Sequence, residues 1–160
     1  MTEPTDPTDP TEPTDPVSAA TTRPGQAIVT AALVGTVVFV VAAAAGLADP
    51  DGLAIGTAVV SIAMFVIGCT TFLWAFAIAV GRSRTDEVTL AGVYFLSAAP
   101  TAARARLLGA LAVQILVALT AGIVRIYTPV AFVALAPMFG LGLAGLWGAR
   151  HATFLPRRRI

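Results

Sequence analysis

Polar side chains that could carry out chemistry are few in this chain, and they lie far apart. Gln114 lies within a long apolar segment, and Arg125 follows eleven residues later, which places both on one face of a helix about three turns apart. Asp49 and Asp51 enclose a proline before Gly52. An amide can bind a polar solute, a guanidinium an anion, and paired carboxylates a cation. We expect the commoner roles instead: a hydrogen bond between helices, an arginine at a helix end, and a tight turn.

Groups that enzymes, ion-coupled transporters and redox proteins need are missing from the sequence. Cys69 is the only cysteine and His151 the only histidine, which excludes a disulfide within the chain and a bis-histidine haem site. The apolar segments hold no charged residue, so no proton or cation relay is visible. The chain is similar in size to the small multidrug transporters but lacks their intramembrane glutamate. We expect no enzymatic activity, no cofactor and no metal ion.

Four uncharged apolar segments position these residues. They cover 27–48, 53–81, 107–124 and 130–149, in a chain with 57% apolar and only 12% charged residues. About 20 apolar residues are enough for a helix to cross the roughly 30 Å core of a bilayer. The third segment is short, but residues 100–106 can extend its helix into the headgroup region. The sequence therefore predicts an all-α bundle of four transmembrane helices, with the lipid bilayer as its first partner.

The connections predict two antiparallel hairpins. Asp49–Gly52 has the residues of a tight turn, and Thr128 followed by Pro129 is typical of a helix start. A loop at 82–106 joins the hairpins. Its mostly apolar part, Val88–Ser97, is too short to span, so we expect it to lie along the headgroups or tuck under the bundle, and its secondary structure stays open.

Arginine placement predicts the orientation. The N-terminal tail, the 82–106 loop and the C-terminal tail hold nine of the ten arginines, and there is no lysine. By the positive-inside rule these three regions face the cytoplasm. We expect a multi-pass protein of the bacterial inner membrane with both termini cytoplasmic. Predicted contacts to lipid headgroups are Arg104, Arg106, Arg157, Arg158 and Arg159. Three arginines at the end of the chain suit anionic headgroups better than nucleic acid, so we expect no nucleic-acid partner.

The two tails flank the membrane domain. Residues 1–26 begin with five tandem copies of Thr-Asp/Glu-Pro, which predicts a disordered, extended and acidic tail because proline at every third position disfavours helix. Residues 150–160 form a basic C-terminal tail. The remaining residues, 27–149, are the predicted membrane domain.

Small residues recur on faces where helices could pack closely. Ala136, Gly140, Ala144 and Gly148 are four residues apart in the last segment, and such faces drive helix association in lipid. The first segment has Ala27, Ala31 and Gly35, and the third has Ala110, Gln114, Ala118 and Gly122. These faces favour packing within the chain, with a homo-oligomer or a hetero-oligomer as the alternative.

Three contacts follow from these faces. We expect the Gln114 amide to bond Thr57, Ser61 or Thr71, and Arg125 to pair with Asp49 or Asp51. Pro137 should kink the last helix and free the carbonyl near Val133.

The overall pattern resembles that of small four-span membrane proteins of high-GC bacteria. Hydropathy, the use of arginine alone and the motif Gly-Leu-Trp-Gly-Ala-Arg-His at 145–151 carry this resemblance, which implies no particular activity. We expect an accessory or scaffold subunit of a membrane complex. The alternative is a small oligomeric channel or facilitator, with Gln114 and the glycines of the last segment lining the path.

Overall fold

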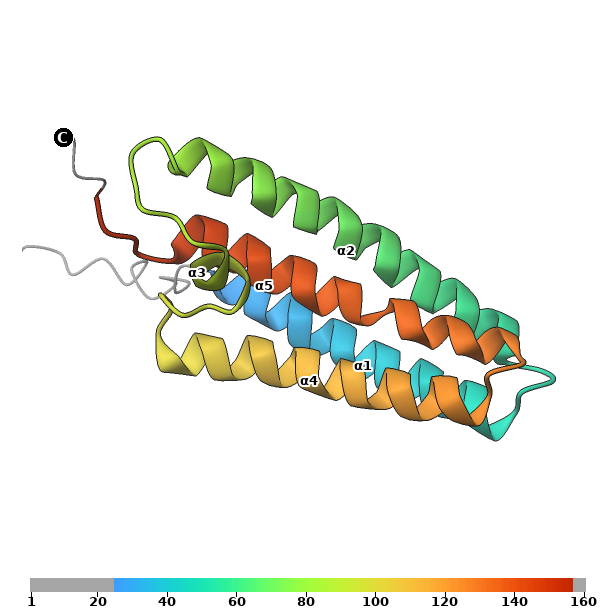
Figure 1. The fold of residues 1–160 in the computed structure, drawn as a ribbon. Helices are drawn as coiled ribbons and strands as arrows, with labels where there is room; N and C mark the ends of the chain where they lie inside the picture. The colour runs from blue at the N-terminus through green and yellow to red at the C-terminus, as the bar shows by residue number, and fades with distance from the viewer. Residues whose placement is uncertain (1–24, 157–160) are drawn as a thin grey trace, which may run out of the picture.

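The protein is a bundle of four long helices. The computed structural model describes residues 25–156, so residues 1–24 of the predicted acidic tail and Arg157–Arg159 lie outside the described residues. The elements are α1 (Gln26–Ala48), α2 (Ala54–Arg82), α3 (Leu90–Tyr94), α4 (Thr101–Val124), the 3-10 helix η2 (Pro129–Leu135) and α5 (Pro137–His151) (Figure 1). No strand forms in the described part of the chain. The predicted all-α four-helix fold is confirmed.

Four helical stretches are long and apolar enough to cross a bilayer: α1, α2, α4 and the combined η2–α5 stretch. Each has at least 23 residues, and about 20 suffice for a crossing. The chain is therefore an integral, multi-pass membrane protein. As expected, residues before Leu107 extend the third span, because α4 begins at Thr101.

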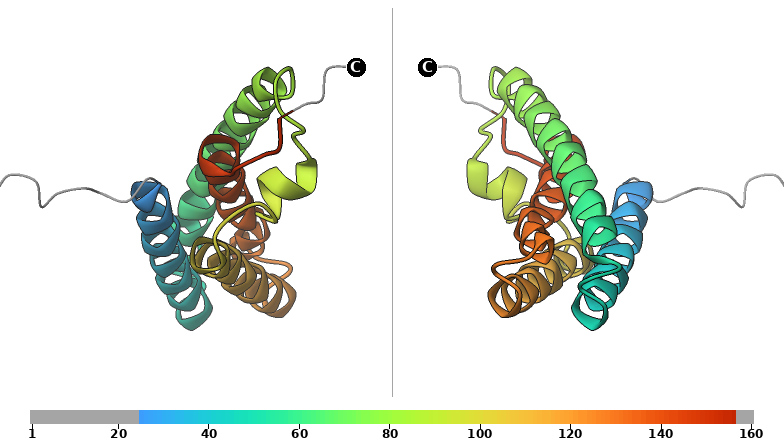
Figure 2. Two further views of the ribbon diagram at one scale, coloured as in Figure 1. Left: turned by 90° about the vertical axis from the view of Figure 1, so that its left-hand side faces the viewer. Right: turned by 90° about the vertical axis from the view of Figure 1, so that its right-hand side faces the viewer.

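The fourth span occupies the centre of the bundle. α5 packs against α1, α2, α3 and α4, and Figure 2 shows the other helices arranged around it. In its most apolar window, 56% of the residues are buried, against 22–28% in the other three spans. The fourth span is thus the interior element, whereas the other three present much of their surface to lipid.

The two ends of the bundle differ in charge. At one end α1 and α4 begin while α2 and α5 end (Figure 1). We call it the arginine-rich end, after Arg82, Arg84, Arg104, Arg106 and Arg150. At the opposite turn end, residues 49–53 join α1 to α2 and residues 125–128 join α4 to η2. α1 and α4 consequently run parallel.

The fourth span is broken near its middle, where η2 gives way to α5. Pro137 has no N–H and occupies the first position of α5, so a continuous α-helix through it would lose a hydrogen bond. The predicted interruption is present, but it is wider than a kink, because all of Pro129–Leu135 is 3-10 helix. The expected free carbonyl at Val133 is wrong, since this oxygen accepts the Ala136 N–H at 3.1 Å.

At the turn end, the connection between α1 and α2 forms the predicted aspartate turn, whereas the start of η2 has no side-chain cap. Asp49 Oδ1 accepts the Gly52 N–H at 3.0 Å, as an aspartate does in a tight turn. Thr128 precedes Pro129 in an extended conformation at the start of η2, but its side chain makes no capping hydrogen bond. Its hydroxyl donates to the Arg125 carbonyl at 2.8 Å.

Candidate functional site

A buried polar cluster joins three helices in the apolar interior. Gln114 has no exposed surface, and its Nε2 donates to Thr36 Oγ1 on α1 at 2.7 Å. Thr36 in turn donates to the Ala32 carbonyl at 2.8 Å. On the other side, the Gly140 N–H of α5 donates to Gln114 Oε1 at 3.2 Å. One amide side chain therefore links α1, α4 and α5.

The break in the fourth span explains why the amide is needed there. The first turn of a helix leaves backbone N–H groups without intrahelical partners, and lipid supplies no water to bond them. Gly140 lies in that first turn, and its missing side chain lets Gln114 approach: a Cβ at this position would lie 2.7 Å from Gln114 Oε1.

The partners expected for Gln114 are wrong. Ser61 and Thr71 donate to carbonyls of their own helix, at Thr57 and Ile67. The Thr57 hydroxyl donates to the Ala42 carbonyl of α1 at 2.8 Å. The Gln114 amide bonds Thr36 and Gly140 instead.

The chemistry open to this cluster is limited. Both polar atoms of the Gln114 side chain and the Thr36 hydroxyl are engaged in hydrogen bonds. An amide paired with a neutral hydroxyl supplies neither a base nor a nucleophile activated by one. Within residues 25–156, no group of three or more His, Cys, Asp or Glu side chains could hold a metal ion.

The small residues predicted on the last span are buried. Ala136 and Ala144 have no exposed surface. A Cβ on Gly148 would collide with the Val93 carbonyl, and one on Gly145 would meet the Tyr94 ring. The face is thus filled by elements of the same chain.

The small-residue faces expected on the first and third spans differ from the buried faces of α1 and α4. Ala110, Gln114 and Ala118 of α4 are buried, whereas Gly122 is only half-buried and Ala121 takes its place. A Cβ on Gly122 would find its nearest neighbour 4.0 Å away. On α1, Ala27 and Ala31 are exposed, whereas Gly35 packs closely on α5, because a Cβ there would collide with the Phe139 ring. The buried face of α1 consists of Val29, Ala32, Thr36, Phe39, Ala43 and Gly46.

Arg125 does not form the ion pair expected with Asp49 or Asp51. Its Nη2 donates to the Leu47 carbonyl at the end of α1, at 3.4 Å. Its Nε is buried and has no hydrogen-bond partner among the described residues. Arginine near a helix C-terminus stabilises the last carbonyls, and here it does so for the neighbouring helix.

The apolar part of the long loop tucks into the bundle. Its residues Leu90–Tyr94 form α3, which packs on α5. Val93 and Tyr94 of α3 are buried, and so is Leu96 just after it. The Tyr94 ring stacks on Phe72 with centroids 4.6 Å apart, and its hydroxyl donates to the Phe72 carbonyl. Burial raises the pKa of Tyr94 above its ordinary value of 10.0, so the hydroxyl is a neutral donor at neutral pH.

Arg82 joins the loop to the end of the chain. Its guanidinium donates to the Ala149 carbonyl at 2.8 Å and to the Ala152 carbonyl at 3.2 Å. It also pairs with Asp86 at 3.3 Å and lies over the Phe154 ring. We call this set the Arg82 clamp. It satisfies carbonyls that the end of α5 leaves without N–H partners.

Arg104 and Arg106, the predicted headgroup contacts within the described chain, are exposed in the first two turns of α4. They therefore belong to the arginine-rich end. Comparison with protein-family models, with curated proteins and with solved structures gives no match.

Proposed function

We propose that the chain is a non-enzymatic accessory or scaffold subunit of a membrane complex, and that the outer face of α2 binds its partner helix. This face carries a seven-residue repeat of small side chains, each followed three residues later by Val or Leu. The small positions are Gly56, Ala63, Thr70 and Ala77, and the larger ones are Val59, Val66, Leu73 and Val80. All eight are exposed.

The α2 repeat is suited to helix association. Lipid tails are as apolar as leucine, so transmembrane helices associate where small residues let their backbones approach. A strict seven-residue repeat keeps one seam in contact along a left-handed crossing. The repeat extends over Gly56–Val80, most of the length of α2. The outer face of α1 instead carries larger side chains at Val34, Val37, Val38 and Val41.

The channel or facilitator alternative has less support. It needs Gln114 and the glycines of the last span to line a path. Gln114 has no exposed surface, and its amide groups bond Thr36 and Gly140. A solute path there would have to break these contacts, and no other feature of residues 25–156 favours one.

Purification in mild detergent tests the proposal. We expect a second polypeptide in fixed stoichiometry with the chain. Ala63→Leu should remove it, because the larger side chain separates the helices. Ala112→Leu, on the exposed face of α4, is the matched control and should retain the partner. Recovery of a homo-oligomer that conducts solute in liposomes, or equal loss with both variants, would contradict the proposal.

The proposed location is a bacterial inner membrane with the arginine-rich end in the cytoplasm. The support is the arginine distribution, since basic loops remain on the cytoplasmic side. A fluorescent protein fused after Ile160 should fluoresce, and a periplasmic phosphatase inserted after Gly52 should be active. The opposite pattern at either site would overturn the orientation.

A further inference from the structure

An apolar groove of about 300 Å³ lies between α1 and α4 near the turn end of the bundle. Thr120 lines it, but its hydroxyl donates to the Leu116 carbonyl at 2.8 Å, so the groove presents almost no polar surface. The apolar side chains that form its walls are Val40, Ala44 and Leu47 of α1 and Leu116, Val117 and Ala121 of α4.

The groove lies within one leaflet of the membrane. Val40, its deepest residue on α1, is eight residues from Ala48, where the helix ends. This separation is about 12 Å along the helix axis. The hydrocarbon of one leaflet is roughly 15 Å thick, half of the bilayer core. The groove therefore runs from the turn-end surface of the membrane toward its middle, which is the path that an acyl chain follows.

Arg125 lies at the mouth of this groove. It follows Ala121 by one helical turn, and its backbone N–H donates to the Ala121 carbonyl at 3.1 Å. Its Nη2 donates to the Leu47 carbonyl at 3.4 Å. Ala121 and Leu47 both line the groove. The Arg125 side chain thus reaches from the end of α4 to the end of α1, at the depth of the lipid headgroups.

The protein satisfies this guanidinium poorly. Arginine has five N–H donors, and the contact with Leu47 is the one side-chain hydrogen bond that Arg125 makes among residues 25–156. Its Nε is buried without a partner, and no carboxylate of the described chain pairs with it. Arg125 therefore keeps donors for an acceptor outside the chain. A phosphate accepts two parallel N–H groups from one guanidinium, and lipid places phosphates at this depth.

The charges around the mouth favour a zwitterionic headgroup over an anionic one. Asp49 and Asp51 follow α1 directly, and both are exposed. α1 and α4 both end here, and helix C-termini carry partial negative charge. A purely anionic headgroup would meet one guanidinium and two carboxylates. A headgroup with both a phosphate and a primary ammonium satisfies both signs, because the ammonium donates hydrogen bonds to carboxylates.

We propose that the α1–α4 groove binds one phosphatidylethanolamine, a glycerophospholipid with a primary-ammonium headgroup. An acyl chain lies in the groove, and the phosphate accepts hydrogen bonds from the Arg125 guanidinium. The ammonium donates to the carboxylates of Asp49 and Asp51. No residue of α2 lines the groove, so the lipid site is separate from the α2 face proposed to bind a partner helix.

Native mass spectrometry of the full-length, delipidated chain in detergent tests the ammonium contact. We expect one phosphatidylethanolamine per chain, bound at least about three-fold more tightly than phosphatidylcholine with the same acyl chains, whose trimethylammonium has no N–H to donate. The double variant Asp49→Asn/Asp51→Asn should bind the two lipids equally. Its amide oxygen can still accept the Gly52 N–H that Asp49 Oδ1 accepts, so the turn is retained. A merely structural role of the aspartates would leave the preference intact.

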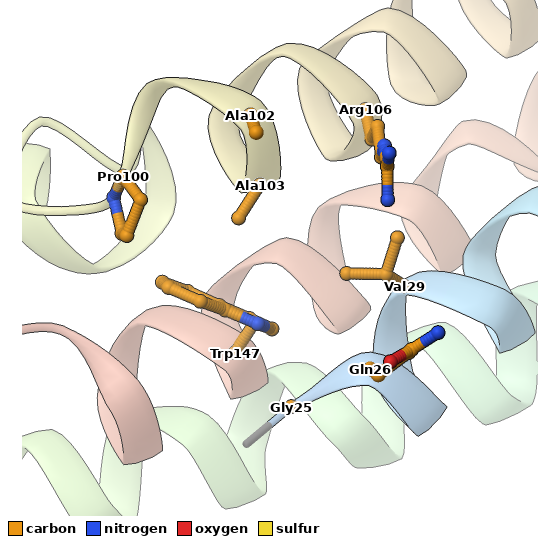
Figure 3. A pocket seen from close by; sticks show the side chains of 8 residues that line it. All are labelled: Gly25, Gln26, Val29, Pro100, Ala102, Ala103, Arg106 and Trp147. Carbon is orange, nitrogen blue, oxygen red and sulfur yellow. The ribbon is translucent and has the colours of Figure 1, made fainter. Parts of the chain in front are cut away.

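Arg125→Gln tests the phosphate contact. It should weaken both lipids about ten-fold, as the loss of a charged hydrogen bond predicts. Arg106→Gln is the matched control on the same helix. Arg106 lines a different pocket, of about 260 Å³, at the arginine-rich end, where Figure 3 shows its side chain extending from α4 toward α1. Its loss should change the affinity by less than about two-fold.

The groove needs a test of its own. Ala44→Phe should fill the groove and weaken both lipids, while Val41→Phe, exposed on another face of α1, should not. Glycerophosphoethanolamine, the headgroup without acyl chains, should not compete at concentrations where the lipid saturates. Equal binding of the two lipids to the wild type, equal effects within either pair of single variants, or competition by the headgroup fragment would overturn the proposal.

Discussion

Gln114 Oε1 accepts the Gly140 N–H at 3.2 Å, so a side chain of α4 closes the first turn of α5 inside the bundle. Together the two residues provide a hydrogen bond for a backbone N–H at the start of α5. Pro137 interrupts the fourth span, and backbone groups in hydrocarbon must find partners within the protein. The glycine admits the amide, and the amide supplies the acceptor. This pairing lets a broken helix occupy the centre of a small bundle.

Gln114→Leu should therefore destabilise the bundle. The change leaves the buried Gly140 N–H without its side-chain acceptor and the Thr36 oxygen without a donor, and we expect a loss of about 1–3 kcal/mol. Reversible unfolding of the purified chain in mixed micelles by a denaturing detergent measures it. Leu119→Ala, at an exposed position of α4, should change the free energy of unfolding by less than about 0.5 kcal/mol. Equal stability of Gln114→Leu and the wild type would refute the role given to the amide.

Gly148→Ala should separate α3 from α5. The added methyl group meets the Val93 backbone carbonyl, which cannot rotate away as a side chain could, and overpacking of this kind costs about 1–3 kcal/mol. Gly109→Ala is the control within a span, because nothing lies within 4 Å of a Cβ there. It should be neutral or slightly stabilising, by up to about 1 kcal/mol. Thermal unfolding in detergent distinguishes the two, and equal transition temperatures would show that α3 does not pack on α5.

Arg82→Gln should release the C-terminal segment. The substitution removes the guanidinium hydrogen bonds to the Ala149 and Ala152 carbonyls. The neighbouring hydrogen bond from the Glu87 N–H to the Leu155 carbonyl, 2.9 Å long, should then weaken as well. Hydrogen exchange of peptides covering 152–156 should accelerate about ten-fold, as a loss of roughly 1.4 kcal/mol in local opening free energy predicts. Arg84→Gln removes the same charge from an exposed position and should leave exchange unchanged. Equal acceleration in both variants would mean that the lost positive charge, and not the lost hydrogen bonds of Arg82, causes the faster exchange.

Hydropathy alone was sufficient for the fold. The four apolar segments hold no charge, so the spans follow from segment length and the antiparallel hairpins from the turn residues between them. The small face of α5 was visible as well, because a four-residue repeat in a helix marks one side of it. The central position of α5 in the bundle could not be predicted, since lipid-facing and interior helices are both apolar.

The side-chain partners could not be read in the same way. Gln114 was recognised as inward-facing, but its partner Thr36 depends on which helix lies beside α4 and in what register. The signal was present in the spacing of Val29, Ala32, Thr36 and Phe39, which is that of a buried face. The arginine pattern uses Arg82 only to predict the orientation. Its hydrogen bonds to the Ala149 and Ala152 carbonyls arise only when the ends of α2 and α5 meet.

Arg125 gives the clearest contrast between the charge pattern and the geometry. Two aspartates expected at the same end of the bundle suggested an ion pair. The Arg125 guanidinium instead donates to the Leu47 carbonyl, and the Asp49 carboxylate accepts the Gly52 N–H. A hydrogen bond to the end of α1 needs no counter-ion. Its contribution should therefore persist when either aspartate is neutralised.

A double-mutant cycle tests this arrangement of Arg125. Arg125→Met should lower the free energy of unfolding by about 1 kcal/mol, the typical net contribution of one hydrogen bond. Asp51→Asn should have little effect, and the coupling between the two changes should stay within the roughly 0.5 kcal/mol expected of independent sites. Raising the salt concentration from about 50 to about 500 mM should leave the Arg125→Met effect unchanged, because salt screens exposed ion pairs and hardly alters a partly buried hydrogen bond. A coupling above about 1 kcal/mol that falls with salt would restore the ion pair.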